Sequence, residues 1–239
     1  MKSIFKKLAG AAVAIALVFC TTGCSNGSSD GASDGTPDYS SCAAGDFILK
    51  DGSVLSKDST PASGSVAAVI VRSAGGGKPA LGVGINHETR QWCTSTAAGY
   101  TTNIGALQGD INSGYMDGRD SWEKLKAACS DAATNPSLYP AWDYCRNYGS
   151  ANGLTGDLAN GWYLPTVAEL YTIYQNKTAV DASLSKAGGS QFGTSWYWSC
   201  CQDPSYDNYA RVLIFISGDM SGTGKIYYAN YVCSVRAFN

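Results

Sequence analysis

The sequence predicts an α+β fold in which short helices pack on small antiparallel sheets and many loops join the elements. Strand-like segments come first along the chain, helix signals fill the middle, and strand and turn signals return after Gly188. The chain has 28 glycines and only 15% charged residues, a composition typical of a loop-rich domain outside the cytoplasm. Because no internal repeat or heptad pattern is present, we expect a single folded domain over residues 42–239.

The first 23 residues resemble the signal peptide of a bacterial lipoprotein. Lysines precede an apolar segment over residues 8–19, which is too short to cross a membrane as a helix. Small residues then precede Cys24, which we expect to be the lipidated first residue of the mature chain. The pattern departs from the usual one at Thr21, where an aliphatic residue is normal, so a plain secreted protein is the alternative.

Residues 24–41 are predicted to form a flexible tether. The segment from Ser25 to Ser41 contains no Val, Leu, Ile or Phe, so it cannot bury enough apolar area to offset the entropy of ordering. With acyl chains on Cys24, this tether would hold the domain clear of the lipid headgroups. We therefore expect a protein of the bacterial cell envelope, anchored to the membrane by lipid and displayed on the outer surface.

The first part of the folded domain is predicted to consist of strands. Residues 46–53 contain a short strand that runs into a turn at Asp51-Gly52. Residues 65–72 and 80–85 have the apolar character of buried strands, and a glycine-rich turn at residues 75–77 lies between them. Two strands joined in this way predict a β-hairpin.

The middle of the chain carries three helix signals. Residues 120–123 (DSWE) have the pattern of a capping box, and Trp122, Leu125 and Cys129 would share one face of the helix that follows. Pro140 suits the first position of a second short helix, for which Gly149 is the expected stop.

The third helix signal, TVAE at residues 166–169, is the clearest capping box of the chain. The Thr166 hydroxyl would accept a hydrogen bond from the amide of Glu169, whose carboxylate would reach back to the amide of Thr166. Residues at 170, 173 and 174 then form an apolar stripe, and we expect this helix to end near Asn176.

Three segments together carry a resemblance to a known family: GWYLPTVAEL at residues 161–170, WYWS at 196–199 and VCSVR at 232–236. The chain resembles bacterial domains with a C-type-lectin-like fold, on the branch shared with formylglycine-generating enzymes. Within that group it is similar to the variable proteins of diversity-generating retroelements, above all the treponemal variable lipoproteins. The resemblance spans about residues 42–239, and DFILKDGS at 46–53 matches the way such domains open.

This resemblance implies a lectin-like scaffold with a C-terminal variable region at about residues 196–238. In the family, a reverse transcriptase copies a template with errors at adenines, and the copy replaces the 3′ end of the gene. Asn codons altered in this way do not yield Trp, Met, Lys, Gln or Glu. Residues of those types in the region are therefore expected to be scaffold or linker positions: Trp196, Trp198, Gln202, Met220 and Lys225.

The remaining residues of the region supply a candidate ligand-binding face. Tyrosine suits such a face because it offers a large contact area with little loss of entropy and a hydroxyl for hydrogen bonding. The candidate residues are Cys201, Asp203, Ser205, Tyr206, Asp207, Asn208, Arg211, Val212, Ile214, Ile216, Tyr227, Tyr228, Asn230, Tyr231 and Ser234. Their simpler interpretation is a polar turn followed by a tyrosine-rich strand.

The apolar segment at residues 210–216 allows two interpretations. The resemblance implies that Ala210, Leu213 and Phe215 point inward, whereas Arg211, Val212, Ile214 and Ile216 point toward the binding face. A continuous apolar run is otherwise typical of a strand that is buried on both faces.

The cysteines are odd in number once the leader is set aside. Of nine cysteines, Cys20 would be removed and Cys24 lipidated, which leaves seven in the folded domain. Exported domains tend to pair their cysteines, so at least one thiol should remain free. Cys201 is the candidate for the unpaired thiol, and Cys145 with Cys233 is a plausible bridge, although the sequence does not fix the connectivity.

Several function classes are disfavoured. Only 17 Lys and Arg residues and a net charge of −2 argue against nucleic acid as a partner. His87 is the single histidine and is expected in a surface loop, which argues against a histidine-rich zinc site and a catalytic triad. Asp203 and Asp207 could supply two ligands to a calcium ion, but the sugar-site motifs of C-type lectins are absent, so we expect no metal site and no cofactor. We expect a monomer that is not an enzyme and binds a protein or other surface ligand. Two alternatives remain: a thiol- or copper-dependent oxidase that uses Cys200 and Cys201, and a structural envelope lipoprotein.

Overall fold

The computed structural model describes residues 38–226 and 230–239. The predicted signal peptide, Cys24, most of the tether, Tyr227 and Tyr228 lie outside the described residues. The strands are β1 Phe47–Leu49, β2 Val54–Leu55, β3 Val66–Arg72, β4 Ala80–Arg90, β5 Trp162–Tyr163, β6 Trp196–Gln202, β7 Tyr209–Ile214, β8 Asp219–Gly224 and β9 Asn230–Phe238. The helices are α1 Ser121–Ala128, α2 Asp131–Thr134, α3 Pro140–Arg146, α4 Tyr148–Ala151, α5 Val167–Gln175 and α6 Lys177–Lys186.

The strands form one sheet in the order β2-β1-β3-β4-β9-β6-β7-β8, with β5 paired to β9 off this path. All of these pairings are antiparallel except that of β6 with β9. This arrangement confirms the α+β class, but the expectation of small separate sheets was wrong. Strand β9 pairs with β4, β5 and β6, and it therefore joins the N-terminal and C-terminal strands into a single nine-stranded sheet.

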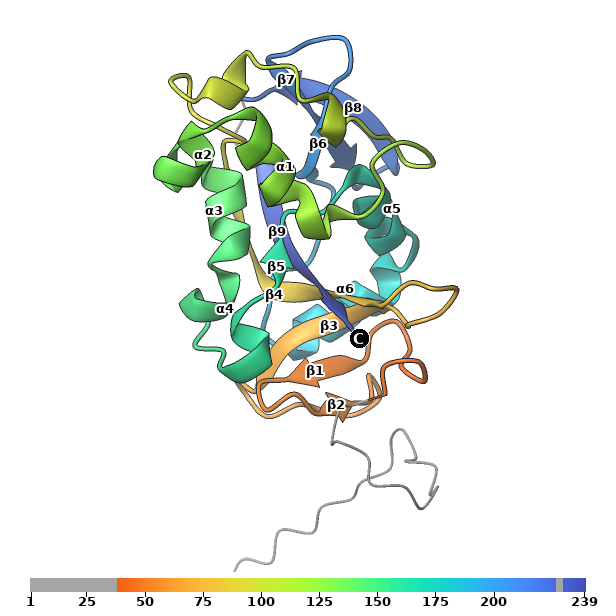
Figure 1. Cartoon of the computed structure of the whole chain (residues 1–239). Coiled ribbons are helices and arrows are strands. Elements are labelled where there is room, and N and C mark those ends of the chain that lie inside the picture. Colours follow the sequence, from red (N-terminus) through yellow and green to blue (C-terminus); the bar gives the residue numbers. More distant parts are fainter. Residues whose placement is uncertain (1–37, 227–229) are drawn as a thin grey trace, which may run out of the picture.

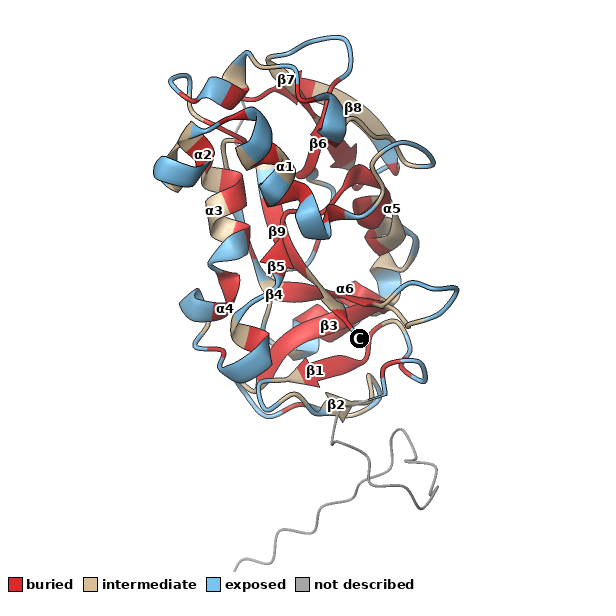
Figure 2. Cartoon of the chain, in the orientation of Figure 1, coloured by how far each residue is buried: buried red, intermediate tan, exposed pale blue. Residues whose placement is uncertain are grey.

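The helices lie on both sides of the central strand (Figure 1). In that view α2, α3 and α4 lie to the left of β9 and α5 lies to its right. Helix α3 packs against β9, α5 against β6 and β7, and α6 against β3. The buried residues follow the central strands and the helix faces turned toward them (Figure 2).

The predicted hairpin of residues 65–85 is confirmed as β3 and β4. Strand β4 is longer than predicted and continues to Arg90, because its second half pairs with β9. His87 lies in this extension and is buried, so its expected place in a surface loop was wrong. Its ring packs against those of Phe192 and Tyr197, contacts that join residues far apart in sequence.

The first helix confirms its predicted face but not its predicted cap. Trp122, Leu125 and Cys129 are buried, as expected. Asp120 precedes α1 without capping it, because its carboxylate accepts a hydrogen bond from the Tyr115 hydroxyl at 2.5 Å and pairs with Lys124. The Asp120 carboxylate therefore binds Tyr115 and Lys124 rather than the backbone amides at the start of the helix.

The second predicted helix begins at Pro140 as expected, but Gly149 does not end it. Helix α3 stops at Arg146, and Gly149 lies inside the next helix, α4. A Cβ at residue 149 would lie 2.2 Å from the carbonyl oxygen of Ala159. The glycine is therefore required for close packing of two segments rather than for a helix end.

Helix α5 has the predicted capping box and ends just before Asn176. The sequence reasoning missed the next helix, α6, which buries Val180 and Leu184. Asp181 fixes it in place, because its carboxylate accepts a hydrogen bond from the amide of Phe192 at 2.8 Å and pairs with Lys177 at 2.6 Å. The serines and threonine of α6 are weak helix formers, so tertiary packing stabilises this helix.

Cys93, Cys129, Cys145, Cys200, Cys201 and Cys233 are buried free thiols in the structure. The suggested bridge between Cys145 and Cys233 is therefore absent, and the thiol of Cys145 donates to the carbonyl oxygen of Cys233 at 3.4 Å. Burial raises the pKa of Cys145 to about 12, which keeps this thiol protonated and unreactive near neutral pH.

Candidate recognition surface

Large apolar side chains reach the surface in one part of the chain. Among the described residues, the exposed large hydrophobic side chains are Trp196 (43% exposed), Tyr206 (61%), Ile216 (68%) and Tyr231 (38%). All four lie within the predicted variable region, residues 196–238. Single exposed apolar residues are common on proteins, but their restriction to one segment of this chain favours a role in recognition.

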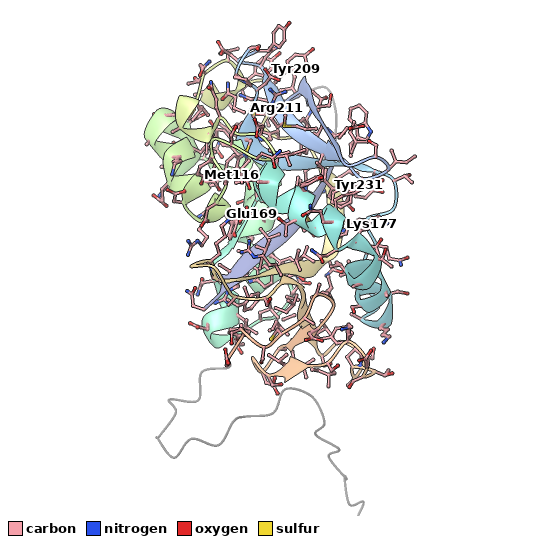
Figure 3. All side chains as sticks on the ribbon, turned by 90° about the vertical axis from the view of Figure 1, so that its right-hand side faces the viewer. Met116, Glu169, Lys177, Tyr209, Arg211 and Tyr231 are labelled. Carbon is pink, nitrogen blue, oxygen red and sulfur yellow. The ribbon has the colours of Figure 1, made fainter. Side chains whose placement is uncertain are left out.

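These side chains lie at opposite ends of the hairpin formed by β6 and β7. Trp196 pairs with Ile214 at one end, whereas Gln202 pairs with Ala210 at the other, next to the loop of residues 203–208. Tyr209 and Ile214 are five positions apart along the strand, a distance of about 17 Å. Figure 3 shows Tyr209 and Arg211 near the top of the molecule and Tyr231 below them. The candidate residues therefore form two surfaces rather than one.

The first surface is an apolar patch of Trp196, Ile214 and Ile216. Trp196, expected as a scaffold or linker position, is exposed at the start of β6, where the strand leaves the core. Trp198 is buried as expected, and its indole N–H donates to the carbonyl oxygen of Arg90 at 2.8 Å. Tyr231 lies near this end, with its ring centroid 5.5 Å from that of Tyr197.

The segment of residues 210–216 agrees in part with each expectation, that of a strand with one outward face and that of a strand buried on both faces. Ala210, Leu213 and Phe215 are buried, as the resemblance implied. Arg211 and Ile214 are half-buried and Ile216 is exposed, so their expected outward positions are borne out in part. Val212 is fully buried and lies between Trp198 of β6 and Ser221 of β8, and Leu213, which points to the other face of the strand, is fully buried as well. The middle of the strand is therefore covered on both faces, and only its ends reach the surface.

Three further candidates are not available to a ligand either. Cys201 and Ser234 are completely buried, the first near the bulge of β6 and the second in the central strand β9. Asp203 is buried as well, and its carboxylate accepts hydrogen bonds from the amides of Ser205 at 2.8 Å and Tyr206 at 3.2 Å. Asp203 therefore shapes the loop, and its assignment as a contact residue was wrong.

The second surface is the 203–208 loop. Ser205, Tyr206 and Asp207 are exposed, and Asn208 is half-buried. The ring of Tyr206 lies 5.4 Å from that of Tyr209, which the sequence reasoning did not include. A tyrosine that directly follows a run of loop candidates was the signal that could have identified Tyr209. The last candidate outside this loop, Asn230, is half-buried at the start of β9.

An ion pair supports the loop from below. Arg211 on β7 binds the Asp203 carboxylate at 2.9 Å, and both side chains are mostly buried. The pair fits only because residue 222 on β8 is glycine, since a Cβ there would lie 2.5 Å from a carboxylate oxygen of Asp203. The Nε atom of Arg211 is buried and has no hydrogen-bond partner in the described residues.

The two adjacent thiols of β6 are enclosed. Both Cys200 and Cys201 are fully buried, and burial raises the pKa of Cys200. The pKa of Cys201 is lowered, mainly by a hydrogen bond from Cys200. Among the described residues, no three His, Cys, Asp or Glu side chains come together as they would around a metal ion.

Two surface hollows lie outside the candidate residues. One of about 490 Å³ is lined by residues 115–117, Arg119, Asp120 and Lys124. The other, of about 380 Å³, lies beside Tyr39, Asp157 and residues 236–239. In both, the basic side chains already bind acidic neighbours, Lys124 to Asp120 and Arg236 to Asp157. Neither hollow therefore presents an uncompensated charge that would define a ligand.

The sequence matches no known protein family and no curated protein. Its structure is similar to that of a fimbrial protein from Bacteroides ovatus ATCC 8483, with a TM-score of 0.62 and 15% sequence identity. The similarity covers 81% of this chain and 48% of the fimbrial protein, so this chain corresponds to about half of that protein. At this identity the likeness shows the fold alone. No helix in the described ranges has the length and apolar character needed to cross a bilayer.

Proposed function

We propose that this protein is a surface-displayed lipoprotein that binds a protein or other exposed ligand through its C-terminal region. The observation that carries the proposal is the restriction of Trp196, Tyr206, Ile216 and Tyr231 to that region. Large aromatic and aliphatic side chains at the surface are the usual anchors of protein interfaces. In this proposal the protein acts as a monomer without a cofactor, and it binds no nucleic acid.

The same proposal includes a C-type-lectin-like scaffold and diversification of its binding residues by a retroelement. The scaffold residues Trp198, Gln202 and Lys225 are buried, which supports a division between a fixed frame and exchangeable surface positions. A similar fold in a fimbrial protein, and an N-terminus of the lipoprotein type, support anchoring of Cys24 at the bacterial cell surface.

Diversification has a direct genomic test. The gene should lie near a reverse-transcriptase gene and a second copy of its 3′ segment that differs only at template adenines. Substitutions in the expressed copy should fall at surface positions such as Ser205 and Tyr206 and should spare Gln202 and Lys225. Finding neither neighbour would remove the retroelement from the proposal and leave a binding lipoprotein.

Ligand binding is tested with the full chain displayed in lipid vesicles. A variant with Trp196, Tyr206, Ile216 and Tyr231 all changed to serine is compared with the wild type for capture of proteins from host and microbial cell surfaces. A matched control replaces Asp58, Glu123, Lys126 and Lys186 with serine, residues that lie outside the region. Partners captured by the wild type and the control but lost from the first variant support the proposal, and equal capture by all three contradicts it.

The alternatives gain no support from the geometry. An oxidase would need Cys200 and Cys201 to meet a substrate or copper ion, and both thiols are enclosed. Copper binding that disappears when both are changed to serine would favour this alternative. A structural lipoprotein predicts no soluble ligand and no effect of replacing Tyr206 or Asn230.

A further inference from the structure

The 203–208 loop joins β6 to β7 and carries the exposed side chain of Tyr206. Its backbone is held by two side chains that come from outside the loop. The carbonyl oxygen of Asp207 accepts hydrogen bonds from the Lys225 ammonium at 2.7 Å and from the Gln202 amide at 3.2 Å. These contacts reach the main chain of the loop, so they do not depend on which side chains the loop displays.

Lys225 is an unusual residue for this position because it is 0% exposed. Its ammonium also donates to the carbonyl oxygen of Gly99 at 2.6 Å and lies 4.6 Å from the ring centroid of Trp92. Two carbonyls and one aromatic face thus surround a group with three N–H donors. A methionine would fill similar space without the cost of burying a charge, so packing alone does not account for the lysine.

Gln202 connects the same loop to a second segment. Its amide oxygen accepts a hydrogen bond from the amide of Ile104 at 3.0 Å, and its amide nitrogen donates to the carbonyl oxygen of Thr102 at 3.0 Å. Every contact of the Gln202 side chain named here is again to backbone. The loop is therefore tied through Gln202 and Lys225 to residues 99–104, which lie far from it in sequence.

We propose that Lys225, assisted by Gln202, is a positioning residue that holds the 203–208 loop in the conformation that presents Tyr206. This inference rests on the proposed function, in which the loop contacts a ligand. We call the contacts of Lys225 and Gln202 with the Asp207 carbonyl the latch. Because the latch binds a backbone group, residues 204, 205, 206 and 208 can change without breaking these hydrogen bonds. A preformed loop loses less conformational entropy on binding, so the latch also favours affinity.

The surroundings of Lys225 make the latch sensitive to alkaline pH. The titratable groups that face its ammonium are the thiols of Cys93 and Cys129 and the carboxylate of Asp207. Burial lowers the pKa of Lys225 to about 8, and it raises the pKa of both thiols, that of Cys93 to about 12. As pH rises through 8, the ammonium becomes a neutral amine while the thiols stay protonated, so its hydrogen bonds to the carbonyls weaken.

Hydrogen exchange on the full chain tests this proposal. We expect Lys225→Met to speed exchange at the amides of Tyr206 and Tyr209 about tenfold, the loss expected when a charge-assisted hydrogen bond is removed. Amides of β4 and β9 should change less than about twofold, because they belong to the central sheet. Lys126→Met is the matched control, since Lys126 is a partly exposed lysine that pairs with Glu123 in the same helix, and it should leave the loop unchanged.

A pH comparison separates positioning from a general structural role. Between pH 7 and 9, after correction for intrinsic exchange, exchange in the loop should accelerate in the wild type and not in Lys225→Met. Unchanged exchange in the loop of a folded Lys225→Met protein, or equal acceleration at every strand, overturns the proposal. If that variant does not fold, Gln202→Met decides the question, with a smaller acceleration of about threefold expected at the same amides.

The two proposals can fail separately. Tyr206→Ser should weaken ligand capture without altering exchange in the loop, because it touches neither Lys225 nor Gln202. If Tyr206→Ser leaves capture intact, recognition through this loop is overturned, while the exchange measurements still decide whether Lys225 positions it.

Discussion

At the scale of single residues, this structure depends on glycines at places where two segments pack too closely for a Cβ atom. Gly222 lies beneath the ion pair of Asp203 and Arg211, and Gly149 lies against the backbone of Ala159. Neither glycine has a positive φ, so a propensity rule gives no reason for its presence. Both are explained by contacts with residues that are distant in sequence.

Replacing Gly222 with alanine should displace the Asp203 carboxylate, because the new Cβ would lie 2.5 Å from its oxygen. We expect a loss of about 1–3 kcal/mol in the free energy of unfolding, since Arg211 would remain buried without its partner. Urea unfolding measures the change. Gly75→Ala is the control, because nothing lies within 4 Å of a Cβ at that position. Equal stability of the two variants would show that the ion pair adapts at no cost.

At the scale of elements, the start of α5 is the most strongly determined feature. Thr166 and Glu169 form the capping box, and the Glu169 carboxylate also accepts a hydrogen bond from the Tyr163 hydroxyl at 2.7 Å. Burial raises the pKa of Glu169 to about 7, although these hydrogen bonds oppose the shift. The segment that carried the family resemblance thus builds a buried polar network that joins β5 to α5.

The raised pKa of Glu169 gives stability a defined pH dependence. The folded protein binds the proton more tightly than the unfolded chain, so this contribution is complete below about pH 4.5 and is lost as pH rises through 7. The glutamine of Glu169→Gln does not titrate, so position 169 should cause no loss in the free energy of unfolding of this variant as pH rises. The free energy of unfolding of the variant relative to the wild type should therefore increase between pH 5 and 8, and a constant difference would contradict the raised pKa.

Strand β7 and the two residues that follow it show how one short segment contributes to both the core and the surface. Val212→Ser should reduce the free energy of unfolding by about 2–3 kcal/mol, because it removes a fully buried aliphatic side chain and buries a hydroxyl. Ile216→Ser, four residues later, should change it by less than about 0.5 kcal/mol, because this side chain is largely exposed. Thermal and urea unfolding of both variants test the contrast. A large loss for Ile216→Ser would show that it supports the scaffold rather than recognition.

At the scale of the whole molecule, the last strand holds the two halves together. Strand β9 pairs with β4 over most of its length and with β5 and β6 beside it. The region proposed to vary therefore contains the central strand of the sheet, so variation is compatible with folding only at positions that leave these pairings intact.

Removing residues 230–239 should abolish cooperative folding, because β4 and β6 would lose their common neighbour. Circular dichroism during heating should show no sharp transition for this truncated chain. Deletion of Asn239 alone is the control and should melt like the wild type, since this residue lies outside β9. A cooperative transition in the truncated chain would show that the N-terminal strands fold independently.

Local sequence signals were sufficient for two elements whose hydrogen bonds join neighbouring residues and have no competing partner among the described residues. The β3–β4 hairpin and the capping box of Thr166 and Glu169 were predicted correctly, because their hydrogen bonds join neighbouring residues. Prediction failed for the cap at Asp120, because the nearby side chains of Tyr115 and Lys124 bind its carboxylate instead of the helix end. It also failed for helix α6, whose contact with the amide of Phe192 comes from outside the helix. The buried position of His87 was missed because the second half of β4, residues 86–90, consists of polar residues and gives no apolar signal of a strand.

The sequence by itself determined the α+β class, the strands and helices with local signals, and the region in which surface aromatic residues are concentrated. Only the tertiary structure decided which candidates in that region reach the surface. Val212, Cys201 and Ser234 are of the same residue types as surface positions, but the fold buries all three completely. Likewise, Lys225 is polar in sequence and buried in the fold, because two carbonyl groups and the ring of Trp92, none of them adjacent in the chain, converge on its ammonium.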